Sequence, residues 1–139
     1  MKDGIKIQEQ DKVYVRYIVN DVKRSVEFYT HYLGFKVEMQ PPSNGFAMLS
    51  IGNLYLLMNP KGQGGAGQTL SDGSIPKPGG WNRMQLRVEN LEQKFRELES
   101  SDVSLRSGMI RGNGGVQILL EDPSGNLIEL FEAYKETGD

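Results

Sequence analysis

The glycines of the stretch GQGGAG are the first residues whose spacing could do chemistry. Gly62, Gly64 and Gly67 match the pattern G-x-G-x-x-G. That pattern cradles a dinucleotide pyrophosphate when a strand precedes it and a helix opens on it. A strand is predicted just before it, over residues 53–60, but the following run QTLSDGSIPKPGGW is too rich in proline and glycine to form a helix. We therefore predict a surface loop here rather than a nucleotide site.

Other reactive side chains are few. The chain has no cysteine, which excludes disulfides, thiolate metal sites and cysteine nucleophiles, and it has one histidine, His31. A metal site built on histidine usually needs two or three of them, and His31 lies in a predicted helix, where we expect a surface position. Glu121 and Asp122 are adjacent carboxylates in a predicted strand. Because neighbouring strand residues point to opposite faces, we do not expect them to share an acid–base role.

Size and charge exclude several classes of protein. The chain has 139 residues, of which 37% are hydrophobic, enough for the core of one domain spanning 1–139. The net charge of −2 and the lack of a Lys/Arg cluster argue against binding to nucleic acid. No apolar run is long enough for a membrane span, and the first twelve residues contain no apolar signal segment. We predict a soluble, cytoplasmic protein with no membrane partner.

The elements that must position any site occur twice along the chain. VYVRYIV alternates as a strand does and is followed by apolar residues at helical spacing; RMQLRV and the residues after it repeat this at an offset of 69. Asp21 and Asn90 are suitable N-cap residues for the two helices, and Gly34 suits the end of the first. The offset superposes Val15 on Met84, Tyr17 on Leu86, Val19 on Val88, Val22 on Leu91, Val26 on Phe95 and Tyr29 on Leu98.

Each half then continues into further strands. A strand is predicted at FKVEM in the first half and at VSLRS in the second; the pairs GFAMLSIG with NLYLLMN and GVQILLE with NLIELFE follow. The chain is therefore predicted to be α+β, built from two tandem β-α-β-β-β modules. Module one covers 12–59 and module two 81–133, joined by a Gly/Pro-rich linker over 60–80. Such a linker is longer than most loops and is a candidate lid.

The two motifs NDVKRSVEFYTHYLGF and EDPSGNLIELFE resemble those of the vicinal oxygen chelate superfamily, which includes glyoxalase I, extradiol dioxygenases and bleomycin-resistance proteins. The likeness covers nearly all of residues 12–133. It implies two curved sheets wrapped around a barrel-like cavity, and it implies a homodimer.

In the metalloenzymes of that superfamily, four strand residues bind one divalent metal. The resemblance places these positions at Tyr14, Leu56, Arg83 and Glu129. Only Glu129 is an ordinary metal ligand, because leucine has no donor atom, arginine is cationic and tyrosine is a poor ligand. We therefore expect no catalytic metal and no other cofactor.

The resemblance also places Arg83 and Glu129 on the same cavity, where a guanidinium and a carboxylate form a good pair. The pair is either a structural ion pair or part of a polar floor for a small, anionic or carbonyl-rich molecule. The predicted ligand-binding residues are Tyr14, Arg16, Leu56, Arg83, Gln85, Gln117 and Glu129, with Arg87 nearby. Trp81, like Gln117, falls on a strand at a possible cavity position, although packing is the commoner role of such residues.

Two other interpretations stay open. The protein is an enzyme of the superfamily, a lyase, isomerase or dioxygenase, in which Glu129 acts as a general base and Tyr14 as an acid or hydrogen-bond donor. Alternatively it is an interaction module whose cavity is filled by its own side chains, namely Leu56, Met58, Leu119 and Phe131.

Overall fold

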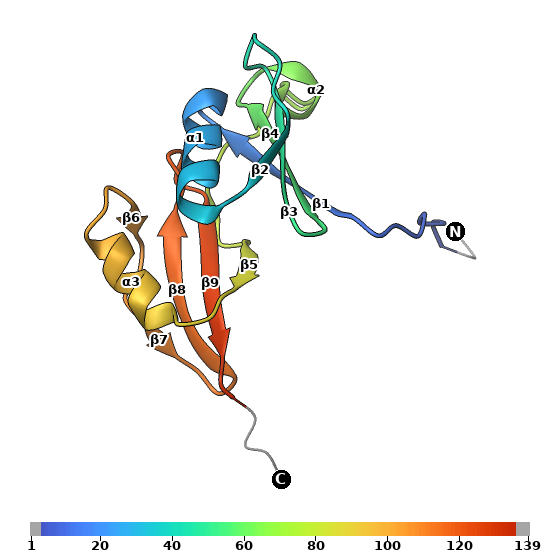
Figure 1. Cartoon of the computed structure of the whole chain (residues 1–139). Coiled ribbons are helices and arrows are strands. Elements are labelled where there is room, and N and C mark those ends of the chain that lie inside the picture. The colour runs from blue at the N-terminus through green and yellow to red at the C-terminus, as the bar shows by residue number, and fades with distance from the viewer. Residues whose placement is uncertain (1–3, 136–139) are drawn as a thin grey trace.

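The computed structural model describes residues 4–135 and forms two sheets from successive halves of the chain (Figure 1). The first half contains β1 (Val13–Val19), α1 (Val22–Leu33), β2 (Lys36–Met39), β3 (Ala47–Ile51) and β4 (Leu54–Pro60). Its strand order is β1-β4-β3-β2, and β1 runs parallel to β4. An N-terminal segment, residues 4–12, extends away from the body of the molecule (Figure 1).

The second half repeats this arrangement with one addition. It contains β5 (Met84–Arg87), α3 (Leu91–Glu99), β6 (Ser104–Leu105), β7 (Ile110–Arg111), β8 (Gly115–Glu121) and β9 (Leu127–Ala133). The order is β5-β9-β8-β6, with β5 parallel to β9 and β7 also pairing with β8. The predicted α+β fold and its repeated β-α-β-β-β pattern are confirmed. The short strand β7 was not predicted.

The helix ends follow the predicted local chemistry. The Asp21 side chain accepts a hydrogen bond from the backbone N–H of Arg24 at 3.0 Å, and α1 ends at Gly34 with φ of 73°. The Asn90 side chain accepts from the N–H of Gln93 at 3.3 Å and starts α3. These caps fix the residue at which each helix begins after the first strand of its module. They therefore set the length of the connection between that strand and its helix.

The core occupies the helix side of both sheets. α1 packs on β2, β3 and β4, and α3 packs on β8 and β9. Many core-facing strand residues are fully buried, and they belong to one cluster that crosses from module to module; they include Val19, Leu49, Leu56, Met58, Ile118, Leu120 and Ile128. The helices therefore cover one face of each sheet, and the opposite faces carry the polar residues described below.

The connection from β4 to β5 contains one helical turn, α2 (Gly64–Gly67), inside the glycine stretch itself. The prediction of a loop without a helix was wrong at these four residues, although residues 68–83 contain no helix. The glycines have local structural causes. Gly62 and Gly64 adopt positive φ, and a Cβ atom at Gly67 would lie 2.0 Å from the carbonyl oxygen of Pro60. Pro60 also ends β4, so the strand extends one residue into the predicted linker.

No helix within residues 4–135 is long and apolar enough to cross a membrane. The expected cytoplasmic location stays a prediction.

Glu132 on β9 supplies an unpredicted second cap for α3. Its two carboxylate oxygens accept hydrogen bonds from the backbone N–H groups of Leu91, at 3.0 Å, and Asn90, at 3.1 Å. These two bonds, that of Leu91 first, lower the pKa of Glu132. A lowered pKa in the folded state gives stability that is present above the unfolded pKa and lost as the pH falls through the folded value.

We expect Glu132→Gln to lower the urea midpoint at pH 7 and to have a much smaller effect at pH 3. The reason is that only the ionised carboxylate is a strong acceptor for both N–H groups at this helix end. The measurement is urea unfolding at both pH values. Glu9→Gln, which removes a carboxylate from the exposed N-terminal segment, is the control and should leave both midpoints unchanged. An equal loss at pH 7 and pH 3 would show that Glu132 acts through packing instead.

Candidate functional site

Strand register decides which residues share the face opposite α3. Gln85 and Leu119 both pair with Glu129, while Arg87 and Gln117 both pair with Phe131. Directly paired residues point to the same side of a sheet, so β5, β8 and β9 place these side chains on one surface. This surface, which we call the polar face, is the side of the second sheet that α3 does not cover.

Glu129 is the centre of the polar face. It is only 7% exposed. Its Oε1 atom accepts from Arg83 Nε and contacts Arg83 Nη2, both at 2.9 Å, and its Oε2 atom accepts from Gln85 Nε2. The side chain of Gln117 lies against the same carboxylate; with its amide nitrogen directed there, it donates at 2.8 and 3.0 Å to the two oxygens. The buried negative charge is therefore balanced by one cation and two amides.

Three further arginines lie beside this cluster or near it. Arg87 donates from Nε to Gln85 Oε1 at 2.6 Å, and its guanidinium lies 4.6 Å from the ring centre of Phe131. Arg106 lies 5.0 Å from the ring centre of Trp81. In module one, Arg16 donates to the side-chain oxygen of Asn59. Within residues 4–135 none of these three forms an ion pair with a carboxylate.

Arg16 and Arg83 meet at a cavity between the modules. We call it the junction cavity; its volume is about 400 Å³, and the segment before β5 forms part of its wall. Among residues 4–135 its lining contains the cations Arg16, Lys77 and Arg83 and no carboxylate; the remaining lining residues are Val15, Tyr17, Ile18, Gly79, Asn82, Met84 and Asn126. A cavity with this lining favours negative charge in a ligand.

The predicted site residues divide into two groups. Arg83, Gln85, Gln117 and Glu129 come together on the polar face, and Arg16 reaches the same junction cavity as Arg83. Sequence reasoning missed Lys77 and Arg106. Lys77 lies in the linker, where no periodicity gives an orientation. Arg106 follows β6 in a loop, so the sequence gives no orientation for it either. In the structure its backbone N–H donates to the Leu119 carbonyl at 2.8 Å, and its guanidinium lies over the Trp81 ring.

Two predicted residues lie elsewhere. Leu56 is fully buried and pairs with Val15, so it belongs to the core on the helix side and not to the site. The residues of β4 on the other face are Tyr55, Leu57 and Asn59, because a shift of one position exchanges the two faces of a strand. Tyr14 is 47% exposed, packs against Tyr55 with ring centres 5.5 Å apart and planes tilted by 47°, and does not line the junction cavity.

The donor set does not fit a divalent metal. The four family positions carry the exposed Tyr14, an apolar or aromatic residue of β4, the cationic Arg83, and Glu129, whose oxygens already accept from protein donors. Within residues 4–135 no three His, Cys, Asp or Glu side chains are grouped so that they could hold a metal ion. The absence of a catalytic metal and of any other cofactor stays a prediction.

A buried hydrogen-bond network, which we call the junction network, joins the two modules beside the cavity; it is formed by the side chains of Asp122, Asn126 and Tyr17. Asp122 accepts from Tyr29 Oη at 2.8 Å and from both nitrogens of Asn126 at 3.0 Å. Asn126 donates to the Ile18 carbonyl and accepts from the Gly79 N–H, each at 2.8 Å. The turn DPSGN, residues 122–126, thus links α1, β1 and the linker. Glu121 bonds separately to Ser104, at 3.2 Å, so the two adjacent carboxylates have different partners.

Tyr17 adds a second connection between the modules. Its hydroxyl donates to the Leu127 carbonyl at 2.8 Å and accepts from the Met84 N–H at 3.0 Å. Burial raises the pKa of Tyr17, and burial followed by the negative charge of Asp122 raises the pKa of Tyr29 well above its usual value. A raised folded-state pKa gives stability that is complete below the unfolded pKa of about 10 and lost as the pH rises through the folded value.

We expect the free energy of unfolding to fall as the pH rises above about 10, because unfolding releases Tyr17 and Tyr29 to ionise. Urea unfolding at intervals from neutral to alkaline pH measures this slope. Tyr29→Phe should be less stable at neutral pH and should show a shallower alkaline decline. Tyr55→Phe, at a partly exposed position, is the matched control and should keep the full slope. An unchanged slope in Tyr29→Phe would contradict the assignment.

Comparisons with known proteins agree with this architecture. The family model described as "Glyoxalase/Bleomycin resistance protein/Dioxygenase superfamily" matches residues 13–130. Searching curated proteins gives no match. Three similar solved structures are TioX from Micromonospora sp. ML1, a member of the same superfamily from Sphaerobacter thermophilus DSM 20745, and lactoylglutathione lyase from Agrobacterium tumefaciens.

The likeness to these three structures extends over most of each chain. The TM-scores are 0.70, 0.68 and 0.60, with 18%, 20% and 18% identity. The matches cover 90%, 87% and 86% of this chain, and 100%, 95% and 90% of the other. At these identities they establish a shared fold.

Proposed function

Because the chain belongs to the glyoxalase/bleomycin resistance protein/dioxygenase superfamily, we propose that it binds a small anionic molecule in the junction cavity, without a catalytic metal. One observation carries the proposal: Arg16, Lys77 and Arg83 line this cavity, and no carboxylate of the part of the chain that the structure describes does so. The volume of about 400 Å³ is within the range of sites for small organic ligands.

The polar face supports this proposal by holding Arg83 in place. The Nε and Nη2 atoms of Arg83 contact the Glu129 carboxylate, and Nη1 of Arg83 donates to the Trp81 carbonyl at 3.3 Å. Glu129 cancels the charge of Arg83, so Arg16 and Lys77 supply the net positive charge of the cavity. A side chain held in advance loses little conformational entropy when a ligand binds, which favours affinity.

The same contacts weigh against Glu129 as a general base. A base needs a free lone pair directed at the proton that it removes. The oxygens of Glu129 instead accept from Arg83 and Gln85, and Gln117 lies against them. Glu129 is therefore better suited to positioning Arg83 than to removing a proton, and binding is preferred over the lyase, isomerase or dioxygenase alternative.

Two measurements test the proposal. Native mass spectrometry of untagged protein, purified without chelators, reports retained metal and retained small molecules together. Calorimetric titration with phosphate, oxalate, malate and phenylphosphonate then identifies the class of anion. We expect at least one of these anions to bind, and Arg16→Gln to weaken it about ten-fold or more, as for the loss of one charge-assisted contact.

The control variant is Lys23→Gln, which removes an exposed cation from α1 and should leave anion affinity unchanged. One stoichiometric divalent ion per chain would overturn the metal-free proposal. Equal affinities for the parent protein and Arg16→Gln, or no binding of any anion in the panel, would overturn the junction cavity as the site.

We further propose a homodimer, as the family resemblance implies. Both edge strands of the first sheet carry exposed apolar side chains: Val13 and Tyr14 on β1, and Val37 and Met39 on β2, are between 41% and 52% exposed. An edge strand has unpaired backbone groups, so a second copy of the chain could pair with either edge. Sedimentation velocity should give a dimer mass for the parent chain, and Val13→Lys should shift the equilibrium toward monomer; a monomer at every concentration would contradict the proposal.

A further inference from the structure

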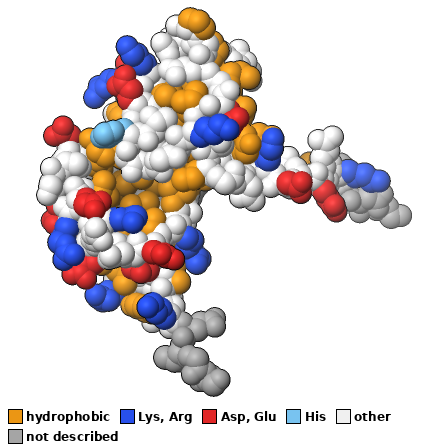
Figure 2. Space-filling model, in the orientation of Figure 1, with side chains coloured by type: hydrophobic (Ala, Val, Ile, Leu, Met, Phe, Trp, Pro, Cys, Tyr) orange, Lys and Arg blue, Asp and Glu red, His pale blue; other side chains and the backbone are white. Residues whose placement is uncertain are grey.

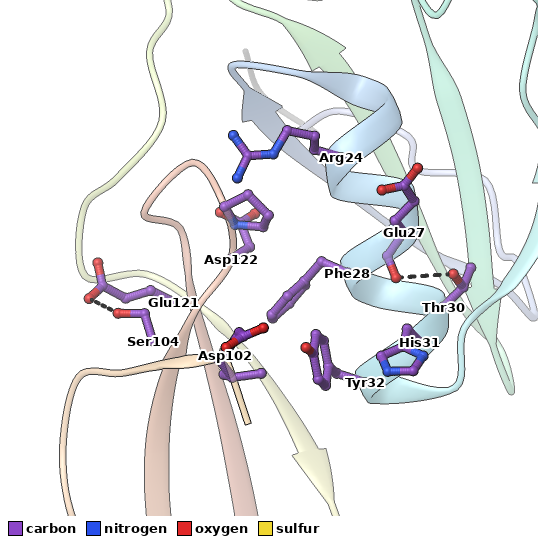
Figure 3. A pocket seen from close by; sticks show the side chains of 12 residues that line it. Arg24, Glu27, Phe28, Thr30, His31, Tyr32, Asp102, Ser104, Glu121 and Asp122 are labelled. Atoms are coloured by element: carbon purple, nitrogen blue, oxygen red, sulfur yellow. Dashed lines mark hydrogen bonds between the residues drawn. The ribbon is translucent and has the colours of Figure 1, made fainter. Parts of the chain in front are cut away.

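A second and larger hollow lies on the helix side of the molecule. It has a volume of about 710 Å³ and shares no lining residue with the junction cavity. α1 forms one wall, and the segment around β6 together with the start of the β8–β9 turn forms the other (Figure 3). We call it the helix groove. Figure 2 shows hydrophobic side chains gathered next to the histidine on this side of the molecule.

Aromatic rings form the floor of the helix groove. The ring centres of Phe28 and Tyr32 are 5.6 Å apart and their planes are tilted by 51°. His31 meets Tyr32 edge-on, with centres 4.6 Å apart. Phe28 is only 7% exposed and packs edge-on against Tyr29 at 5.1 Å, so its position is fixed by the core. Such a floor suits a flat ring or a cation placed over ring faces.

The charges around this floor are mainly negative. Glu27, Asp102 and Asp122 line the groove against a single arginine, Arg24. Glu121 lines it too, but its carboxylate turns away to Ser104 (Figure 3). The carboxylate oxygens of Asp122 already accept hydrogen bonds within the junction network. Within the described residues, the Asp102 carboxylate has no ion pair or side-chain hydrogen bond, and it lines the same groove as Phe28 and Tyr32 (Figure 3).

We propose that the helix groove binds a small protonated aromatic amine, with its ring against Phe28 and Tyr32 and its ammonium group at Asp102. The aromatic floor supplies apolar contact and cation–π attraction, and Asp102 supplies an unpaired acceptor at the edge of the floor. This preference is opposite in charge to that of the junction cavity. The two sites therefore differ in position and in ligand class, and this proposal does not depend on the first.

The single histidine gives a direct readout. The imidazole proton signals of His31 belong to one residue and lie on the groove wall, so they report its occupancy by NMR. Tryptamine, 3-methylindole and indole-3-acetate are the probes, and they present a similar ring with a positive, no, or a negative charge. We expect saturable shifts with tryptamine, and at least ten-fold weaker binding of both other compounds.

Asp102→Asn should abolish the preference for tryptamine over 3-methylindole, and Tyr32→Ala should weaken tryptamine binding about ten-fold. Asp11→Asn, in the exposed N-terminal segment, is the matched control and should leave affinity unchanged, as should Arg16→Gln in the junction cavity. Equal binding of the three probes, no saturable shift with tryptamine, or an unchanged affinity in Asp102→Asn would each overturn the proposal.

Discussion

Replacing Arg83 with methionine is expected to destabilise the protein by about 3–5 kcal/mol, the usual cost of leaving a buried carboxylate without its cation. Glu129 has a side chain only 9% exposed, and Arg83 is the single cation that contacts it among the described residues. The amides of Gln85 and Gln117 cannot replace the lost charge. Urea unfolding at pH 7 measures the effect, provided that the slope of the transition is unchanged.

Two variants make this prediction specific. Removing both charges in Arg83→Met/Glu129→Met should recover most of the loss, because a buried ion pair is replaceable by apolar groups of similar volume. Arg96→Met is the matched control: its pair with Glu92, at 3.4 Å on the surface of α3, should be worth less than about 1 kcal/mol. If Arg83→Met costs no more than Arg96→Met, Glu129 does not depend on Arg83.

Asp122→Ala is expected to cost a similar amount, about 3–5 kcal/mol, for a different reason. The substitution removes the acceptor of the buried Tyr29 hydroxyl, of the Ser124 N–H and of both Asn126 nitrogens. Each buried donor left unpaired costs about 1–3 kcal/mol, and such costs are only partly additive because the remaining groups rearrange. Thermal and urea unfolding should both show the loss.

The control for Asp122→Ala is Asp102→Ala, an exposed aspartate on the other wall of the helix groove, which should change stability by less than about 0.5 kcal/mol. Asp122→Asn should fall between the two, since it keeps one acceptor oxygen but presents an N–H group to other donors. A loss in Asp122→Ala no larger than that of Asp102→Ala would show that the DPSGN turn does not hold the modules together.

The fold was predictable from the sequence because its determinants are local. Strand alternation, the caps at Asp21 and Asn90, and Gly34 each act within a few residues, and the offset of 69 shows that the pattern occurs twice. β7 was missed because two residues carry no periodicity. Glu132 was missed because a cap supplied by β9 lies 42 positions away from Asn90 along the chain.

The site was predictable only where family motifs fixed the register. The contact between Arg83 and Glu129 is present, and its role in binding a ligand stays a prediction. Leu56 was placed on the wrong face because residues 54–58 of β4 are apolar or aromatic on both faces, so their alternation does not say which side is the core. Lys77 lines the junction cavity from the linker, and Arg106 lies in a loop beside Trp81, while the helix groove arises where the two modules meet. No pattern in the sequence predicts the positions of these loop residues or the presence of the groove.

The junction network also has a consequence for the order in which the chain folds. Its hydrogen bonds join residues 93, 108 and 110 positions apart, whereas the strands within each module pair over much shorter distances. Closing such long loops costs entropy that only a completed interface repays. Each module should therefore assemble on its own and the two should dock late. Weakening the network then speeds unfolding while leaving the folding rate almost unchanged.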